Sequence, residues 1–181
     1  TIKLDGNYPV GTNNVALGNL ALSGSLSGSN NVAIGHATLD FNTSGSSNTG
    51  VGYASLTDNS TGTDNTGVGE FSLANNTSGY RNTALGSSAL FTNTTGIDNT
   101  AVGASSLYAN TTGGSLVAVG KSSLTANTTG SRNVAVGFSA LETNTTGNNN
   151  TAVGNASLEA NTTGGQNASF GRNSMLNNTT G

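Results

Sequence analysis

The stretch Asn133-Val134-Ala135-Val136-Gly137 is one copy of a block that recurs along the chain. Its glycine returns every 17 residues, at Gly18, Gly35, Gly52, Gly69, Gly86, Gly103, Gly120, Gly137, Gly154 and Gly171. Each block is followed by an apolar residue, Leu or Met, and then by a turn that most often reads Asn-Thr-Thr-Gly. A period this strict predicts a repeat architecture in which every unit forms one structural element of the same kind.

The chain divides into ten such units, from residue 14 to residue 181, preceded by a leader of residues 1–13. We number positions 1 to 17 within each unit from the residue that opens it, so that Asn133 is at position 1 and Gly137 at position 5. The tenth unit stops at Gly181, two residues short of a full period, so we expect the chain to be a piece of a longer protein.

The residue types at each position predict two short strands per unit. Positions 2 to 4 are mostly β-branched or small, and residues 105–108 illustrate a second candidate strand at positions 7 to 10. We expect the large apolar residues at positions 4 and 9, such as Val102 and Leu107, to fill the interior. The small residue at position 3, such as Ala118, then lies on the opposite face of the strand and contacts a neighbouring chain.

Glycine at positions 5 and 15 is expected to form the corners, because it accepts positive φ without strain. Two strands and two corners in 17 residues predict an all-β fold, a parallel β-solenoid or β-roll with one coil per repeat. The interval between glycines is too short for helix-pair repeats.

Stacking the coils at about 4.8 Å per rung places residues of the same repeat position directly above one another. One asparagine column then lies at the position-12 turn and a second at position 1, interrupted only by Leu116. The position-12 residues also open N-glycosylation sequons, so this column is either an amide ladder or a set of glycosylation sites. Its members are Asn42, Asn59, Asn76, Asn93, Asn110, Asn127, Asn144, Asn161 and Asn178.

The composition excludes several classes of function. The net charge is −3 with only five Lys and Arg residues, which gives no electrostatic footprint for nucleic acid. There is no cysteine, hence no disulfide or thiolate metal site, and no apolar run long enough to insert this segment into a membrane. We expect no cofactor and no bound metal.

The blocks at residues 31–35, 99–103 and 150–154 resemble the head repeats of YadA-like trimeric autotransporter adhesins, in a 17-residue variant. Similar repeats occur in phage tail-fibre-like proteins, and the resemblance covers residues 14–181. It implies a left-handed β-roll in which three chains pack side by side, in a fibre outside the cell or on a virion surface. The implied partners are further copies of the chain, a host receptor, a glycan or neighbouring fibres.

Few side chains are candidates for a site. Phe91 and Tyr108 share position 10 in successive units and are predicted to stack, marking a lateral contact with a sister chain, a glycan or another fibre. Asp64, Arg81 and Asp98 share position 17 and are predicted to form a charge ladder at the surface. The single histidine, His36, is at a variable exposed position.

Three functions follow as hypotheses. The first is a non-catalytic, adhesin-like fibre segment, or a phage tail-fibre shaft. The second is an ice-binding solenoid, suggested by the repeated Thr-Thr pairs. The third, a glycan-cleaving domain, depends on the only stacked acidic pair, Glu142 and Glu159, which lacks a predicted cleft. We expect the chain not to be an enzyme.

Overall fold

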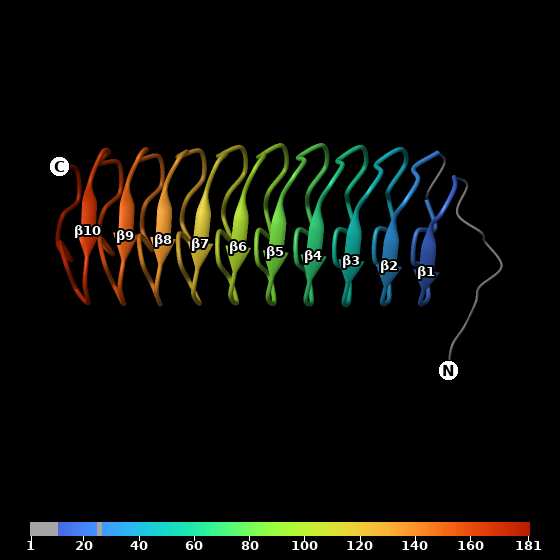
Figure 1. Cartoon of the computed structure of the whole chain (residues 1–181), viewed down its shortest axis with the longest axis horizontal. Coiled ribbons are helices and arrows are strands. Elements are labelled where there is room, and N and C mark those ends of the chain that lie inside the picture. The colour runs from blue at the N-terminus through green and yellow to red at the C-terminus, as the bar shows by residue number, and fades with distance from the viewer. Residues whose placement is uncertain (1–10, 25–26) are drawn as a thin grey trace.

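The computed structural model of the chain describes residues 11–24 and 27–181, so residues 1–10 of the predicted leader lie outside the described residues. Ten three-residue strands lie side by side in one row along the long axis of the molecule (Figure 1). The strands are β1 (Val15–Leu17), β2 (Val32–Ile34), β3 (Thr49–Val51), β4 (Thr66–Val68), β5 (Thr83–Leu85), β6 (Thr100–Val102), β7 (Val117–Val119), β8 (Val134–Val136), β9 (Thr151–Val153) and β10 (Ala168–Phe170).

All ten strands form one parallel sheet whose strand order follows the sequence. The register pairs each residue with the residue 17 positions later, as in Thr100 with Val117 and Ala101 with Ala118. The strands are connected by turns and bends, which carry the chain from one rung to the next. The predicted all-β parallel solenoid, with one 17-residue coil per repeat, is therefore confirmed.

The second strand predicted at positions 7 to 10 is absent from the described coils, where this segment is a compact series of turns. Its backbone alternates in handedness: Ser105 has a φ of 56° and Leu107 a φ of 51°. A strand requires consecutive extended residues, and left-handed residues at positions 7 and 9 break that run. The turns instead direct the position-9 leucine into the coil, where Leu107 is fully buried.

The strand faces are the reverse of those predicted. Position 3 lies inside, with Ala101 and Ala118 fully buried, whereas position 4 is partly exposed on the outside, as at Leu85. Position 3 is small because the interior is narrow: a Cβ on Gly50 would lie only 2.5 Å from Cγ2 of Thr38. The core is a column of position-9 leucines packed against these small residues.

Both glycine columns are required by close packing between coils, and position 5 also requires positive φ. Position-5 glycines have positive φ, for example 130° at Gly103, as expected, and a Cβ on Gly103 would lie 2.6 Å from the carbonyl carbon of Gly120. Position-15 glycines are required by close packing alone. A Cβ on Gly96 would lie 2.6 Å from the carbonyl oxygen of Gly113 in the next coil.

Hydrogen bonds between neighbouring coils hold the stack together. The amide of Val117 donates to the carbonyl of Asn133 in the following coil, and that of Gly120 donates to Val102 in the preceding one. Within the described residues, every buried side-chain nitrogen and oxygen has a hydrogen-bond partner. A coil therefore depends on both of its neighbours, as is typical of solenoids.

Candidate functional site

The position-12 asparagines form the predicted amide ladder. Nδ2 of Asn110 donates both to Oδ1 of Asn93, at 2.9 Å, and to the carbonyl oxygen of Gly113, at 3.0 Å. The same pair of bonds recurs in successive coils, and the eight residues from Asn42 to Asn161 in this column are fully buried. Asn178, in the last coil, is partly exposed.

This geometry bears directly on the sequons. Both hydrogens of a ladder amide are engaged, and Nδ2 lies in the packed interior of the corner. An attached glycan would replace one of these hydrogens and would need a path to solvent. The folded coils therefore favour the ladder over glycosylation at the eight buried positions.

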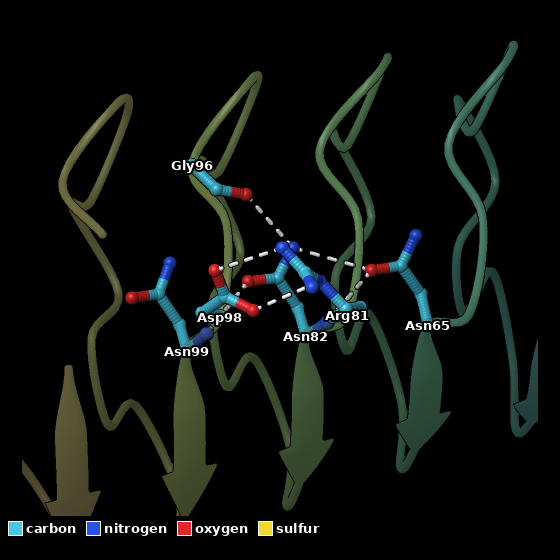
Figure 2. A network of polar contacts seen from close by, with 6 residues as sticks. All are labelled: Asn65, Arg81, Asn82, Gly96, Asp98 and Asn99. Atoms are coloured by element: carbon cyan, nitrogen blue, oxygen red, sulfur yellow. Dashed lines mark hydrogen bonds and ion pairs between the residues drawn. The ribbon is translucent and has the colours of Figure 1, made fainter. Parts of the chain in front are cut away.

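The position-1 asparagines form a second ladder, which Figure 2 shows beside the charged residues of position 17. Nδ2 of Asn82 donates to the carbonyl oxygen of Gly96 at 2.8 Å, and Oδ1 of Asn82 accepts from the backbone amide of Asn99 at 3.1 Å. Leu116 interrupts the side-chain ladder, yet its backbone amide still donates to Oδ1 of Asn99. Both ladders hold the carbonyl of the position-15 glycine, which fixes the corner.

The charge ladder is present as one ion pair. Nε of Arg81 lies 2.9 Å from Oδ1 of Asp98, and a second nitrogen of the same guanidinium lies 3.2 Å from Oδ2 (Figure 2). Arg81 also lies over the ring of Tyr80, 4.8 Å from its centroid. Asp64 occupies the same column one rung away. Because the side chains of Arg81 and Asp98 are 56% and 39% exposed, the pair contributes little to stability.

The predicted stack of Phe91 on Tyr108 is confirmed, with ring centroids 5.1 Å apart and planes within 6° of each other. It is one end of a longer series of rings, whose other members the sequence pattern did not predict. His36 stacks on Tyr53, Tyr53 contacts Phe71 edge to face, and Phe71 contacts Phe91 in the same way. We call these five rings, from five successive coils, the aromatic strip.

The outward side of the sheet forms a long, uncharged and mostly apolar surface, which we call the sheet face. Position 4 is aliphatic in nine strands and Phe in β10, and neither position 2 nor position 4 carries a charged residue in any unit. At about 4.8 Å per rung, ten strands make this surface about 43 Å long. Its side chains are Val15, Leu17, Val32, Ile34, Thr49, Val51, Thr66, Val68, Thr83, Leu85, Thr100, Val102, Val117, Val119, Val134, Val136, Thr151, Val153, Ala168 and Phe170.

The Thr-Thr pairs lie at a corner, at positions 13 and 14. The first hydroxyl of a pair is used within the stack: Oγ1 of Thr94 donates to the carbonyl of Thr111 at 3.1 Å, and Thr111 repeats the bond to Thr128. The second threonine, such as Thr112, is exposed. The pairs therefore present single rows of hydroxyls and lend no support to a flat ice-binding array.

The acidic residues form no catalytic arrangement in the described coils. A shallow cavity of about 290 Å³ is lined by Thr143, Glu159, Ala160, Leu176 and Asn177, but Glu142 does not line it. No group of three His, Asp or Glu side chains among the described residues is placed to hold a metal ion.

Asp58 is a partly buried carboxyl in the turns that follow β3. Partial burial, together with the charge of nearby Asp40, raises the pKa of Asp58 above its ordinary value. Asp40 also accepts a hydrogen bond from the hydroxyl of Ser23.

Comparison of the chain with protein-family models, curated proteins and solved structures finds no match. The part of the chain that the structure describes has no helix with the length and hydropathy of a membrane span.

Proposed function

We propose that the chain is a stiff, non-catalytic fibre segment that associates laterally with two further copies of itself through the sheet face. The observation that carries this proposal is the continuous row of outward apolar side chains at position 4 of all ten strands. Leu17, Ile34, Val68 and Leu85 are each more than a third exposed. Contiguous apolar surface of this extent on a soluble protein usually marks an interaction site.

The interior alone gives each coil little apolar stabilisation. Most coils bury one large apolar residue, at position 9, such as Leu90, together with small residues at positions 3 and 8, such as Ala84 and Ala89. Ordering the backbone costs about 1–2 kcal/mol per residue, so a 17-residue coil gains from any further apolar burial. Covering the sheet face would stabilise the fold by about 25 cal/mol for each Å² of apolar surface removed from water.

Regular spacing suits the sheet face to lateral contact between copies. Residues of one column repeat at the same interval in every copy, so two sheet faces packed side by side keep the same register along their whole length. The absence of charge from positions 2 and 4 leaves no like-charge repulsion in the contact. Such a fibre would present its corner side chains outward, to a receptor, a glycan or a neighbouring fibre.

A fibre that presents adhesive corners fits a location outside the cell, on a cell or virion surface. This part of the proposal draws its support from the repeat's resemblance to adhesin heads and tail fibres. The alternative, a phage tail-fibre shaft, would use the same lateral contact through the sheet face.

Sedimentation velocity tests the proposal. Val102→Lys combined with Val119→Lys places two charges one rung apart on the sheet face, and Thr112→Lys with Thr129→Lys is the matched pair on an exposed corner. We expect the parent and the corner variant to sediment as three chains and the sheet-face variant as one folded chain. A monomeric parent, or an unchanged sheet-face variant with normal circular dichroism, overturns the proposal.

A further inference from the structure

Position 14, the residue before the position-15 glycine, carries a hydroxyl in all ten units and is exposed in all of them. Position 17 is also exposed in the nine units that contain it, yet it varies among Asn, Ser, Asp, Arg and Gln. The units therefore differ freely at one exposed corner position and keep a hydroxyl at another. The position-14 residues, which we call the hydroxyl row, are Ser27, Ser44, Thr61, Ser78, Thr95, Thr112, Thr129, Thr146, Thr163 and Thr180.

Hydrogen bonding explains the neighbouring polar columns of this corner but not the hydroxyl row. At position 13, Oγ1 of Thr111 donates to the carbonyl oxygen of Thr128 at 3.0 Å, and Thr128 repeats the bond to Thr145 at 3.1 Å. Position 12 carries the buried amide ladder. Within the described residues, no hydrogen bond involves the hydroxyl of Thr112 or Thr129, which lie beside the bonded threonines. The fold therefore uses the first hydroxyl of each pair and leaves the second unused.

Turn preference does not account for the hydroxyl row either. Asn, Asp and Gly are favoured in turns as well as Ser, and position 14 carries none of these three in any unit. Backbone conformation is more demanding at position 17, where Arg81 and Asp98 adopt φ of 56° and 58°, and yet the side chain varies there. What the ten units share at position 14 is thus the hydroxyl group itself, on an open corner.

We propose that the hydroxyl row is a set of modification sites, to which sugars are attached through the Ser or Thr oxygen. In this reaction the hydroxyl oxygen forms a bond to C1 of a sugar carried as its glycosyl diphosphate, and the bond between C1 and the diphosphate oxygen breaks. The diphosphate leaves with the bonding electron pair, and the hydroxyl proton passes to a general base of the transferring enzyme. Position 14 lies outside the sheet face, so this inference does not depend on lateral association.

A covalent modification fits the hydroxyl row better than reversible binding does. A binding site needs several convergent polar groups, whereas each coil offers one hydroxyl beside a glycine. A modifying enzyme needs an accessible hydroxyl in a recurring local sequence, and Asn-Thr-Thr-Gly recurs unchanged in the last six units. The corner thus presents the same acceptor again on every rung.

The spacing of the hydroxyl row favours an uncharged sugar over a phosphate. Successive hydroxyls are one rung apart, about 4.8 Å along the stack. Two unit charges at that distance repel by about 1 kcal/mol in water, and a phosphate group carries about 1.5 to 2 negative charges at pH 7. Phosphates on neighbouring rungs would therefore repel one another along the whole corner, and neutral sugars would not.

Mass spectrometry of the intact chain, isolated from the cells that produce it, tests the inference. We expect masses above that of the unmodified chain in steps of one sugar residue. Fragmentation that retains side-chain groups should place these sugars at position 14. An unmodified mass overturns the inference, and so do added groups that are phosphates, that lie at position 13 or that are attached to asparagine.

Matched variants produced in the same cells locate the reaction. Thr112→Val with Thr129→Val removes two hydroxyls of the row and should remove two modified sites. Thr112→Ser with Thr129→Ser keeps both hydroxyls, as at Ser44, and should keep both sites. Thr111→Val, at the adjacent position 13, should leave the number of modified sites unchanged. An unchanged number in the valine pair, or loss of both sites in the serine pair, contradicts the inference.

Sedimentation of the valine pair separates this inference from the proposed lateral association. A variant that loses two modified sites and still sediments as three chains supports the modification independently of the sheet face. An unmodified parent that sediments as three chains overturns the modification alone.

Discussion

The side-chain amide of Asn110 donates to Oδ1 of Asn93 in the preceding coil, across 2.9 Å. The same amide donates to the carbonyl of Gly113, while Oδ1 of Asn110 accepts from Asn127 in the next coil. The asparagines of the turn therefore form a continuous buried chain of hydrogen bonds along the fibre. Their number in the sequence reflects a structural requirement that recurs in each coil.

Asn110→Ala should destabilise the solenoid, because it leaves Oδ1 of Asn93 and one hydrogen of Asn127 without partners in a buried corner. Each orphaned group costs about 1–3 kcal/mol. Thr112→Ala, two residues along on the exposed surface, is the control and should change stability by less than about 0.5 kcal/mol. Thermal unfolding followed by circular dichroism distinguishes the variants, and equal melting temperatures would contradict the ladder's structural role.

Ala118→Leu should overpack the narrow interior, because position 3 faces the leucine column. The expected destabilisation is about 1–3 kcal/mol. Val119→Leu is the control on the outer side of the same strand, where Leu85 already occupies position 4. A variant with leucine at 118 that melts like the parent but loses its oligomeric state would instead place position 3 at a contact between chains.

Asp58→Asn should raise the melting temperature slightly at pH 7. The folded chain holds this carboxyl with a raised pKa, so it binds the proton more tightly than the unfolded chain does. Ionised Asp58 is therefore unfavourable to folding above its folded pKa, and this cost disappears as the pH falls below the ordinary value for Asp. Asparagine already occupies this column at Asn75.

Melting curves of the parent and the Asp58→Asn variant at pH 7 and pH 3 test whether ionised Asp58 destabilises the fold. The gain from Asp58→Asn should be present at pH 7 and absent at pH 3. A gain that is the same at both values would attribute it to a cause other than ionisation.

Much of the fold could be predicted from the sequence because repetition makes each position a column. The coil length, the parallel register, the asparagine ladder and the stack of Phe91 on Tyr108 all follow from placing residues 17 apart on neighbouring rungs. Which side of the strand is inside could not be predicted this way. Alternation shows that Val102 and Ala101 face opposite ways. Because valine is larger and more apolar, Val102 was expected to face the interior, whereas the structure buries Ala101.

The turn at positions 7 to 10 was mispredicted for a local reason. Residues other than glycine rarely adopt positive φ, so nothing in the sequence marks Ser105 and Leu107 as left-handed. The aromatic strip was missed for the same reason. Positions 6, 7 and 10 are neighbours only after this turn forms, so Tyr53, Phe71 and Phe91 seemed unrelated in the sequence.

The most direct test of lateral association is cross-linking from a single cysteine, since the chain contains no native one. Val119→Cys places a thiol on the sheet face, and Thr129→Cys places one on an exposed corner. A bismaleimide of short span, added at low protein concentration, reports which surface meets another copy. We predict covalently linked chains on a denaturing gel from Val119→Cys and almost none from Thr129→Cys. Equal or greater linkage from Thr129→Cys would contradict association through the sheet face.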